Sequence, residues 1–227
     1  MANVIVSGAS RGIGLELVRA HLAAGDQVHA LARDPSSPAL AALQSEANGR
    51  LAIHQADVAS DDSIAAAAAA TGNEPVDIIY NVAGITGKTP AALEPGDWEG
   101  FDDSIEIMLK GPLRVLRAFL PRLGEGSKVI NFSSQLAAST WPYGGYYGYV
   151  AAKSGLNRMM RSAALDLKDR GIVIGIVHPG YVQTDMGGPD ADISPAESAA
   201  SIIKLTREWP LERSGDFYKW NGEEHAW

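Results

Sequence analysis

Short runs of β-branched and other apolar residues alternate along the chain with longer stretches rich in alanine and leucine. The short runs are apolar throughout, which is typical of strands buried on both faces of a parallel sheet. We predict strands at Asn3–Val6, Val28–Ala32, Leu51–Gln55, Val76–Tyr80, Lys128–Phe132 and Ile172–Val177. The longer stretches predict helices near 12–24, 38–48, 61–71, 97–123, 150–170 and 195–208.

This alternation favours an α/β fold, a doubly wound parallel sheet of six or seven strands with helices on both faces, known as the Rossmann fold. The chain has 227 residues and shows neither an internal repeat nor a stretch with the composition of a linker. We therefore expect a single domain over residues 1–227.

Composition excludes several classes of function. The 19 basic and 27 acidic residues give a formal charge of −8, which disfavours a broad surface for nucleic acid. There is no cysteine, and the five histidines include no pair at metal-ligand spacing, so we expect no metal site. No apolar run approaches the roughly 20 residues of a membrane span, and no signal peptide is evident, so the expected location is the cytoplasm.

A glycine-rich turn follows the first predicted strand, in the segment Ser7-Gly8-Ala9-Ser10-Arg11-Gly12-Ile13-Gly14. Helical spacing begins directly after it. Glycines between a strand and a helix allow a tight turn, a close approach of the backbone to a pyrophosphate, and exposure of the amides at the helix start. The segment therefore predicts a dinucleotide site, although a glycine-rich turn alone is also compatible with a simple loop.

The end of the second strand bears on the choice of dinucleotide. An acidic residue there would bind the ribose 2′-hydroxyl of NAD, whereas a cation would accommodate the 2′-phosphate of NADP. Ala32 occupies the acidic position and Arg33 follows it, while Arg11 in the glycine turn can reach the same phosphate. Two arginines and the missing acid favour NADP(H). The alternative is that Arg33 is an ordinary loop residue, partly neutralised by Asp34.

Tyr149 and Lys153 are four residues apart in a predicted helix and so share one face. A cation near a phenol favours its ionised form and makes it a better proton donor, as general-acid reduction of a carbonyl requires. Ser134 ends the strand at Lys128–Phe132, where a hydroxyl can stabilise charge that develops on a substrate oxygen. The alternatives are a surface pair for Tyr149 and Lys153 and a helix cap for Ser134.

Taken together, these segments resemble the short-chain dehydrogenase/reductase family over essentially the whole chain. The resemblance implies that Tyr149 is the catalytic acid and base, that Lys153 holds the nicotinamide ribose and lowers the Tyr149 pKa, and that Ser134 positions the carbonyl. The substrate site is then formed by the C-terminal half. The same resemblance implies that the cofactor is bound by Gly8, Ser10, Arg11, Gly12, Ile13, Gly14, Arg33, Asp57, Val58, Asn81, Ala83, Gly84, Tyr149, Lys153, Pro179, Gly180, Val182 and Thr184.

More narrowly, residues 178–188 and the ending from Ser214 to Trp227 are similar to the branch that contains the C-factor and the sniffer-type carbonyl reductases. One position departs from the family. Members usually carry an asparagine in the central helix that helps to hold a water of the proton relay, and Met108 aligns there. A thioether cannot supply that amide.

Aromatic residues lie between Ser134 and Tyr149. Trp141, Tyr143 and Tyr147 are candidates for the wall of a pocket for a hydrophobic carbonyl compound, or alternatively for packing against a partner subunit or a neighbouring helix. The aromatic residues near the end of the chain are expected to dock on the body or on a second copy, which suggests a homo-oligomer, a dimer or tetramer.

The resemblance implies an NADPH-dependent carbonyl reductase that acts on a small carbonyl compound or the corresponding alcohol. A rival hypothesis is a regulatory or signalling protein that binds NADP(H) and turns over little, motivated by Met108 and by the C-factor relatives. A mainly structural homo-oligomer is a third.

Overall fold

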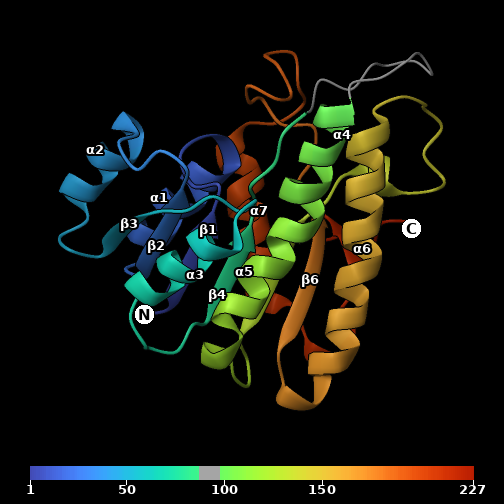
Figure 1. Cartoon of the computed structure of the whole chain (residues 1–227). Helices are drawn as coiled ribbons and strands as arrows, with labels where there is room; N and C mark the ends of the chain where they lie inside the picture. The colour runs from blue at the N-terminus through green and yellow to red at the C-terminus, as the bar shows by residue number, and fades with distance from the viewer. Residues whose placement is uncertain (87–97) are drawn as a thin grey trace.

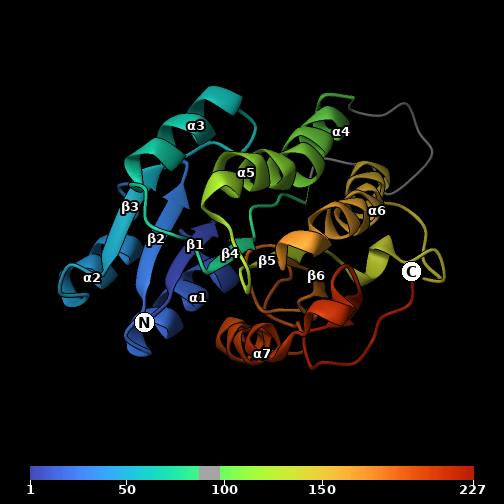
Figure 2. The ribbon, with the colours of Figure 1, turned by 90° about the horizontal axis from the view of Figure 1, so that it is seen from below.

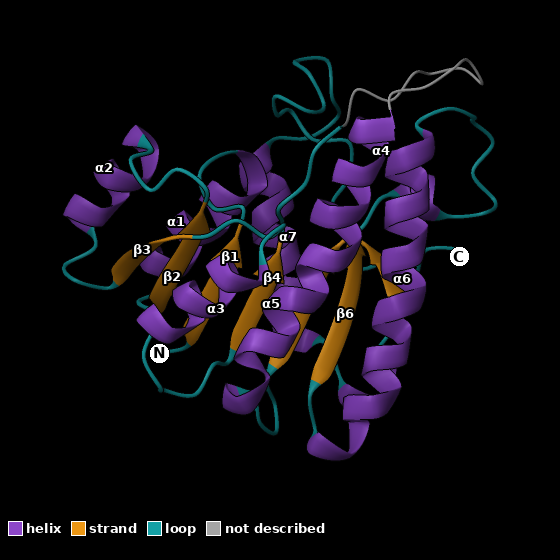
Figure 3. Ribbon diagram, viewed as in Figure 1, coloured by secondary structure: helices purple, strands orange, loops and turns teal. Residues whose placement is uncertain are grey.

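The computed structural model describes residues 1–86 and 98–227. Seven parallel strands form one sheet in the order β3-β2-β1-β4-β5-β6-β7 (Figures 1 and 3). The strands are β1 (Asn3–Ser7), β2 (Gln27–Ala32), β3 (Leu51–Gln55), β4 (Ile78–Asn81), β5 (Lys128–Phe132), β6 (Val173–His178) and β7 (Phe217–Lys219). Most are buried along nearly their full length, as their unbroken apolar composition predicts.

Helices cover both faces of this sheet (Figure 2). One face carries α1 (Gly12–Ala23), α2 (Pro38–Glu46) and α7 (Pro195–Glu208). The other carries α3 (Asp61–Ala70), α4 (Trp98–Ser104), α5 (Gly111–Phe119) and α6 (Tyr147–Leu167). Each layer of helices has its own apolar core against the sheet. Short 3₁₀ helices lie at Leu120–Arg122, Gln135–Ala137, Lys168–Arg170 and Leu211–Arg213. The predicted doubly wound fold is therefore confirmed.

The six predicted strands are all present: Leu51–Gln55 and Lys128–Phe132 match the prediction, and the other four are shifted by one or two residues at their ends. The seventh strand comes from the aromatic segment near the end of the chain, where Phe217 is buried and β7 pairs with β6. Docking of that segment on the body of the protein is therefore confirmed for Phe217. Within the described part of the chain, no helix combines the length and the apolar character needed to cross a membrane.

The predicted helix 97–123 is less regular than its sequence pattern indicates; its expected first residue, 97, lies outside the described residues. After α4 the backbone forms a π-helical segment, Ile105–Lys110, before α5 begins at Gly111. Pro112 accounts for the break, because proline has no amide hydrogen and its ring collides with the carbonyl one turn earlier in an α-helix. That earlier residue is Met108.

β1 and β4 lie side by side at the centre of the sheet. From β1 the chain adds β2 and β3 on one side, and it then crosses to β4 and adds β5, β6 and β7 on the other side. Such a reversal opens a crevice at the carboxyl ends of the two strands. The glycine turn after β1 and the segment after β4 meet there. The fold thus gathers the motifs of both halves of the chain at one edge.

Candidate active site

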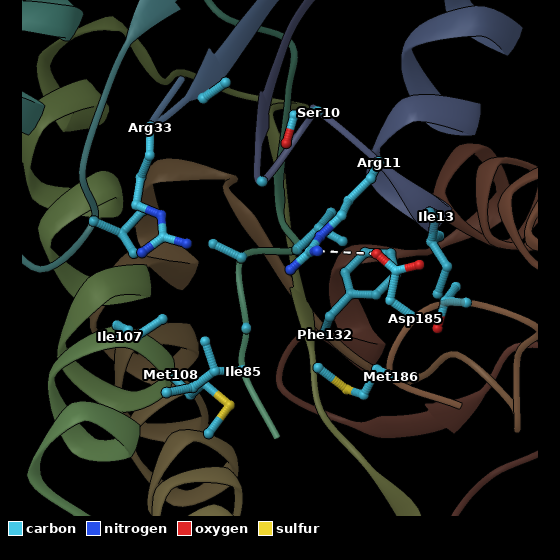
Figure 4. Close-up of a pocket in the computed structure, with 18 of the residues that line it drawn as sticks. Ser10, Arg11, Ile13, Arg33, Ile85, Ile107, Met108, Phe132, Asp185 and Met186 are labelled. Atoms are coloured by element: carbon cyan, nitrogen blue, oxygen red, sulfur yellow. Dashed lines mark hydrogen bonds and ion pairs between the residues drawn. The ribbon is translucent and has the colours of Figure 1, made fainter. Parts of the chain in front are cut away.

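A pocket of about 610 Å³ occupies this edge of the sheet. Its walls come from the turns after β1, β2, β3 and β4, from the π-helical segment, from the start of α6 and from the loop after β6. Figure 4 shows Arg11 and Arg33 above, and Ile85, Ile107, Met108 and Met186 grouped below them. The pocket thus has a polar end, near the two arginines, and an apolar end, near these four side chains.

The conformation of the glycine turn and its close contact with the segment after β4 both require glycine at position 8. Its φ of +75° lies in the left-handed region, and a Cβ there would sit 2.7 Å from the backbone of Ala83. Only glycine therefore allows the turn after β1 to lie directly against the segment after β4. Gly8 and Ala83 both line the pocket.

The start of α1 presents backbone amides to the same pocket. Arg11 is the residue before the helix, and its side chain does not cap the free amides. Gly12 and Ile13, the first helical residues, line the pocket. Uncapped amides at a helix start attract anions. This end of the pocket fits a dinucleotide pyrophosphate.

Two arginines stand near that end. Arg33 is exposed, lines the pocket, and has no ion pair or hydrogen bond to any residue in 1–86 or 98–227. Arg11 instead pairs with Asp185, with its Nη1 2.9 Å from the carboxylate Oδ2 (Figure 4). Arg33 is therefore available to a 2′-phosphate, whereas Arg11 has a competing anion.

Tyr149 and Lys153 line the other end of the pocket, and Ser134, which does not line it, contacts Tyr149. The hydroxyl groups of Tyr149 and Ser134 are hydrogen-bonded to each other. Lys153, on the same face of α6, donates from Nζ to the carbonyl oxygen of Phe132 at 2.6 Å and lies 5.9 Å from the centre of the Tyr149 ring. The strand end of β5 and one face of α6 thus assemble a phenol, a hydroxyl and an ammonium group.

Burial has the largest effect on the electrostatics of Tyr149. Burial raises the pKa of its phenol, and the hydrogen bond with Ser134 opposes that rise. The Lys153 ammonium group is directed to the Phe132 carbonyl in this arrangement. Burial lowers the pKa of Lys153 itself to about 8. Tyr149 is therefore protonated at neutral pH, as a proton donor must be.

Buried hydrogen bonds hold the strand ends that carry this site. Ser133 Oγ donates to Asn157 Oδ1 on α6 at 2.5 Å, which ties the end of β5 to the helix of Tyr149. Asn81 Nδ2 donates to Asn131 Oδ1 at 2.9 Å and joins β4 to β5. Both contacts are fully within the protein interior, where an intact polar network fixes a unique arrangement.

Comparison with known proteins identifies the family. The model that describes short chain dehydrogenases matches residues 2–192, which include the glycine turn and the Tyr149 and Lys153 pair. The chain belongs to this family.

Individual relatives agree with the narrower resemblance. The C-signal of Myxococcus xanthus is 39% identical over 158 residues, 67% of this chain and 93% of that protein. The NADPH-bound carbonyl reductase from chicken fatty liver has a TM-score of 0.90 and 30% identity, over 100% of this chain and 99% of that one. The carbonyl reductase Sniffer of D. melanogaster has a TM-score of 0.93 and 26% identity, with full coverage of both chains.

Most residues expected at the cofactor site of this short chain dehydrogenase line the pocket: Gly8, Ser10, Arg11, Gly12, Ile13, Arg33, Asp57, Val58, Ala83, Gly84, Tyr149, Lys153, Pro179 and Thr184. The other four expected residues do not line the pocket. Asn81 bonds between strands, Val182 bridges to Ile193, Gly14 sits inside α1 beneath the turn, and Gly180 packs close to Trp220. These four residues hold or pack the segments that carry the lining residues.

The aromatic candidates for the substrate wall are elsewhere. Trp141, Tyr143 and Tyr147 do not line this pocket; Trp141 and Tyr143 pack on each other, and Tyr143 is 73% exposed. The apolar end is formed by residues that sequence reasoning missed, chiefly Ile85, Ile107, Phe132 and Met186. Each lies within two residues of a position that the sequence analysis singled out, Ile107 being next to Met108, so adjacency to a motif was the usable signal.

Met108 lines the pocket and is fully buried. It packs against the segment after β4, with its Sδ 3.6 Å from the place where a Cβ on Gly84 would lie. The Met108 side chain, at the position that usually carries an asparagine, therefore packs between the π-helical segment and the segment after β4.

Proposed function

We propose that this short chain dehydrogenase is an NADPH-dependent oxidoreductase that reduces an aldehyde or ketone to an alcohol. The observation that carries the proposal is the convergence of Ser134, Tyr149 and Lys153 beside a pocket that fits a dinucleotide. A phenol kept protonated by burial, next to a hydroxyl group, is suited to protonate a carbonyl oxygen. The carbonyl reductases with similar structures support the same reaction class.

The residues present fit NADPH. The turn at Gly8 and the uncapped start of α1 suit the pyrophosphate, and Arg33 is free to pair with a 2′-phosphate. Lys153 would hold the nicotinamide ribose, as the family resemblance implies. The reduced nicotinamide, when bound, supplies the hydride that reaches the carbonyl carbon.

The protein supplies the proton and the geometry. The Ser134 hydroxyl holds the substrate oxygen, and Tyr149 gives its phenolic proton to that oxygen as the carbonyl becomes an alcohol. The Lys153 ammonium, charged below a pKa of about 8, favours the phenolate left behind. The apolar side chains at this end of the pocket exclude water and favour an uncharged substrate.

A second candidate function is a regulatory or signalling protein that binds NADP(H) with little turnover. Two observations favour it: Met108 stands where the family usually has an asparagine, and the relative with 39% identity is a C-signal. The intact Ser134, Tyr149 and Lys153 group weighs against it, because a sensor has no chemical need for all three.

One experiment separates the candidates. NADPH consumption is followed with a panel of aromatic and aliphatic aldehydes, ketones and diketones, for the wild type, Tyr149→Phe and the control Tyr147→Phe. Tyr147 is exposed and does not line the pocket. We expect turnover to fall about 100- to 10,000-fold in Tyr149→Phe alone, with a much smaller effect on NADPH affinity. NADPH binding without turnover of any compound would favour the regulatory function.

A further inference from the structure

Arg114 on α5 joins the π-helical segment to the region of Val58 and Asp61, which is more than 50 residues away in sequence. Its Nη1 donates to the carbonyl oxygen of Val58 at 3.2 Å and to that of Glu106 at 3.1 Å. Its Nη2 lies 2.7 Å from the Glu106 carboxylate, and its Nε 3.2 Å from that of Asp61. The side chain is only 15% exposed, so these contacts are largely shielded from water.

Each of these partners has a defined place. Val58 lies in the loop after β3 and lines the pocket together with Asp57. Asp61 begins α3, which follows that loop, and Glu106 belongs to the π-helical segment. A guanidinium group is a rigid fork with five donors, which lets one side chain serve four acceptors. A lysine offers one nitrogen and cannot span the same set.

Close packing brings α5 to the loop. A Cβ on Gly111, one turn before Arg114, would lie 3.0 Å from Cβ of Val58 and 3.3 Å from its carbonyl oxygen. Glycine is therefore what allows α5 to touch the loop after β3. Arg114 then fastens the loop through the same carbonyl that Gly111 approaches.

The loop has few other anchors. Asp57 N donates to Ser63 Oγ at 2.9 Å, and Ala59 N donates to the Asp57 carboxylate at 2.9 Å. Both of these contacts are local and join the loop to itself or to the start of α3. Ala56 N, at the start of the loop, donates to the Ala32 carbonyl of β2 at 2.9 Å, and Arg114 adds a hydrogen bond from α5 that holds the Val58 backbone beside the pocket.

We propose that Arg114 is a positioning residue for the adenosine end of the cofactor. It holds the loop of Asp57 and Val58 in the place where the pocket receives the adenine, while the reacting groups lie at the other end. This inference rests on the proposed NADPH site. It assigns the effect of Arg114 to affinity for the nucleotide rather than to the chemical step.

The test is direct binding of adenosine 2′,5′-bisphosphate, followed by calorimetry, to the wild type, Arg114→Met and Arg114→Lys. Arg117→Met is the control, because Arg117 is exposed on the same helix. We expect binding to weaken about 5- to 20-fold in Arg114→Met, by less in Arg114→Lys, and not at all in Arg117→Met. The KM for NADPH should rise in parallel, with kcat at saturating NADPH within about twofold of the wild type.

Equal binding of the bisphosphate by wild type and by folded Arg114→Met would overturn the inference. So would a loss of kcat with an unchanged KM for NADPH. Arg114→Lys keeps a cation between Asp61 and Glu106, so it tests the position of the loop if Arg114→Met does not fold. Failure of the wild type to bind the bisphosphate would instead refute the proposed NADPH site.

Discussion

Arg11 and Asp185 form an ion pair across the mouth of the pocket, one from the turn after β1 and the other from the loop after β6. Both side chains are mostly exposed, at 69% and 76%. The pair joins two pocket-lining segments, and its two residues are 174 positions apart in the sequence. A phosphate group that binds Arg11 has to compete with the Asp185 carboxylate.

Asp185→Asn is therefore expected to tighten NADPH binding. Exposed ion pairs contribute about 0.2–1 kcal/mol, which corresponds to an affinity gain of up to about fivefold. NADH, which lacks the 2′-phosphate, should gain less. Calorimetric titration with both cofactors measures the effect, with Asp190→Asn in the same exposed loop as the control. Weaker NADPH binding by Asp185→Asn would show that the pair helps to close the pocket.

The pH dependence of reduction should identify Lys153. Burial lowers its pKa to about 8, so the ammonium is charged below that pH and neutral above it. Burial raises the Tyr149 pKa, so the phenol stays protonated over the same range. We expect kcat/KM for the carbonyl compound to be level below pH 8 and to fall above it.

Lys153→Arg supplies the check on this assignment. Arginine stays charged at all accessible pH values, so the residual activity of this variant should lose the decline above pH 8. A decline that persists unchanged in Lys153→Arg would assign it to another group.

Local patterns were enough to predict the sheet and the glycine turn. The strands are continuous apolar runs, and the turn at Gly8 depends on residues that are close together in sequence. The pairing of Arg114 with Val58 could not be predicted in this way, because 56 residues separate them and neither belongs to a periodic pattern with the other. The short strand β7 was missed for a similar reason: its three residues are identified only by their pairing with β6.

The π-helical segment had a signal in the sequence that a periodic pattern overlooks. Pro112 inside the predicted helix 97–123 removes one amide donor, and the backbone accommodates it by placing the proline near the start of α5. The substrate end was harder to predict, because the loop that holds Trp141 and Tyr143 has the composition of a pocket wall, yet neither residue lines the pocket.

Met108→Asn restores the residue that the family usually has at this position and tests its effect on stability and turnover. Met108 is fully buried and packs near Gly84, so a shorter polar side chain loses apolar contacts and buries an amide. We expect the free energy of unfolding to fall by about 2 to 4 kcal/mol. Denaturant unfolding measures it, with the less buried Met159→Asn as the control. Increased turnover per folded molecule would show that the missing amide limits the proton relay.

Truncation of Met186 and truncation of Tyr143 are expected to have different effects on the KM for the substrate. Met186 is 46% exposed and lines the apolar end of the pocket, whereas Tyr143 is 73% exposed and does not line it. Truncation of Met186 to alanine removes apolar surface that a bound carbonyl compound would cover. A loss of about 1 kcal/mol of such contact corresponds to a KM about fivefold higher. We expect this for Met186→Ala with an apolar aldehyde, and no change for Tyr143→Ala.

Steady-state kinetics at saturating NADPH measure both variants, with the same aldehyde and with a smaller aliphatic one. The effect of Met186→Ala should shrink with the smaller compound, because less of the substrate reaches the truncated side chain. A higher KM in Tyr143→Ala and an unchanged KM in Met186→Ala would place the substrate against the loop of Trp141 and Tyr143 rather than against the apolar side chains of the pocket. The chemistry at Tyr149 would then act on a compound that enters from that side, and the aromatic loop would be the determinant of specificity.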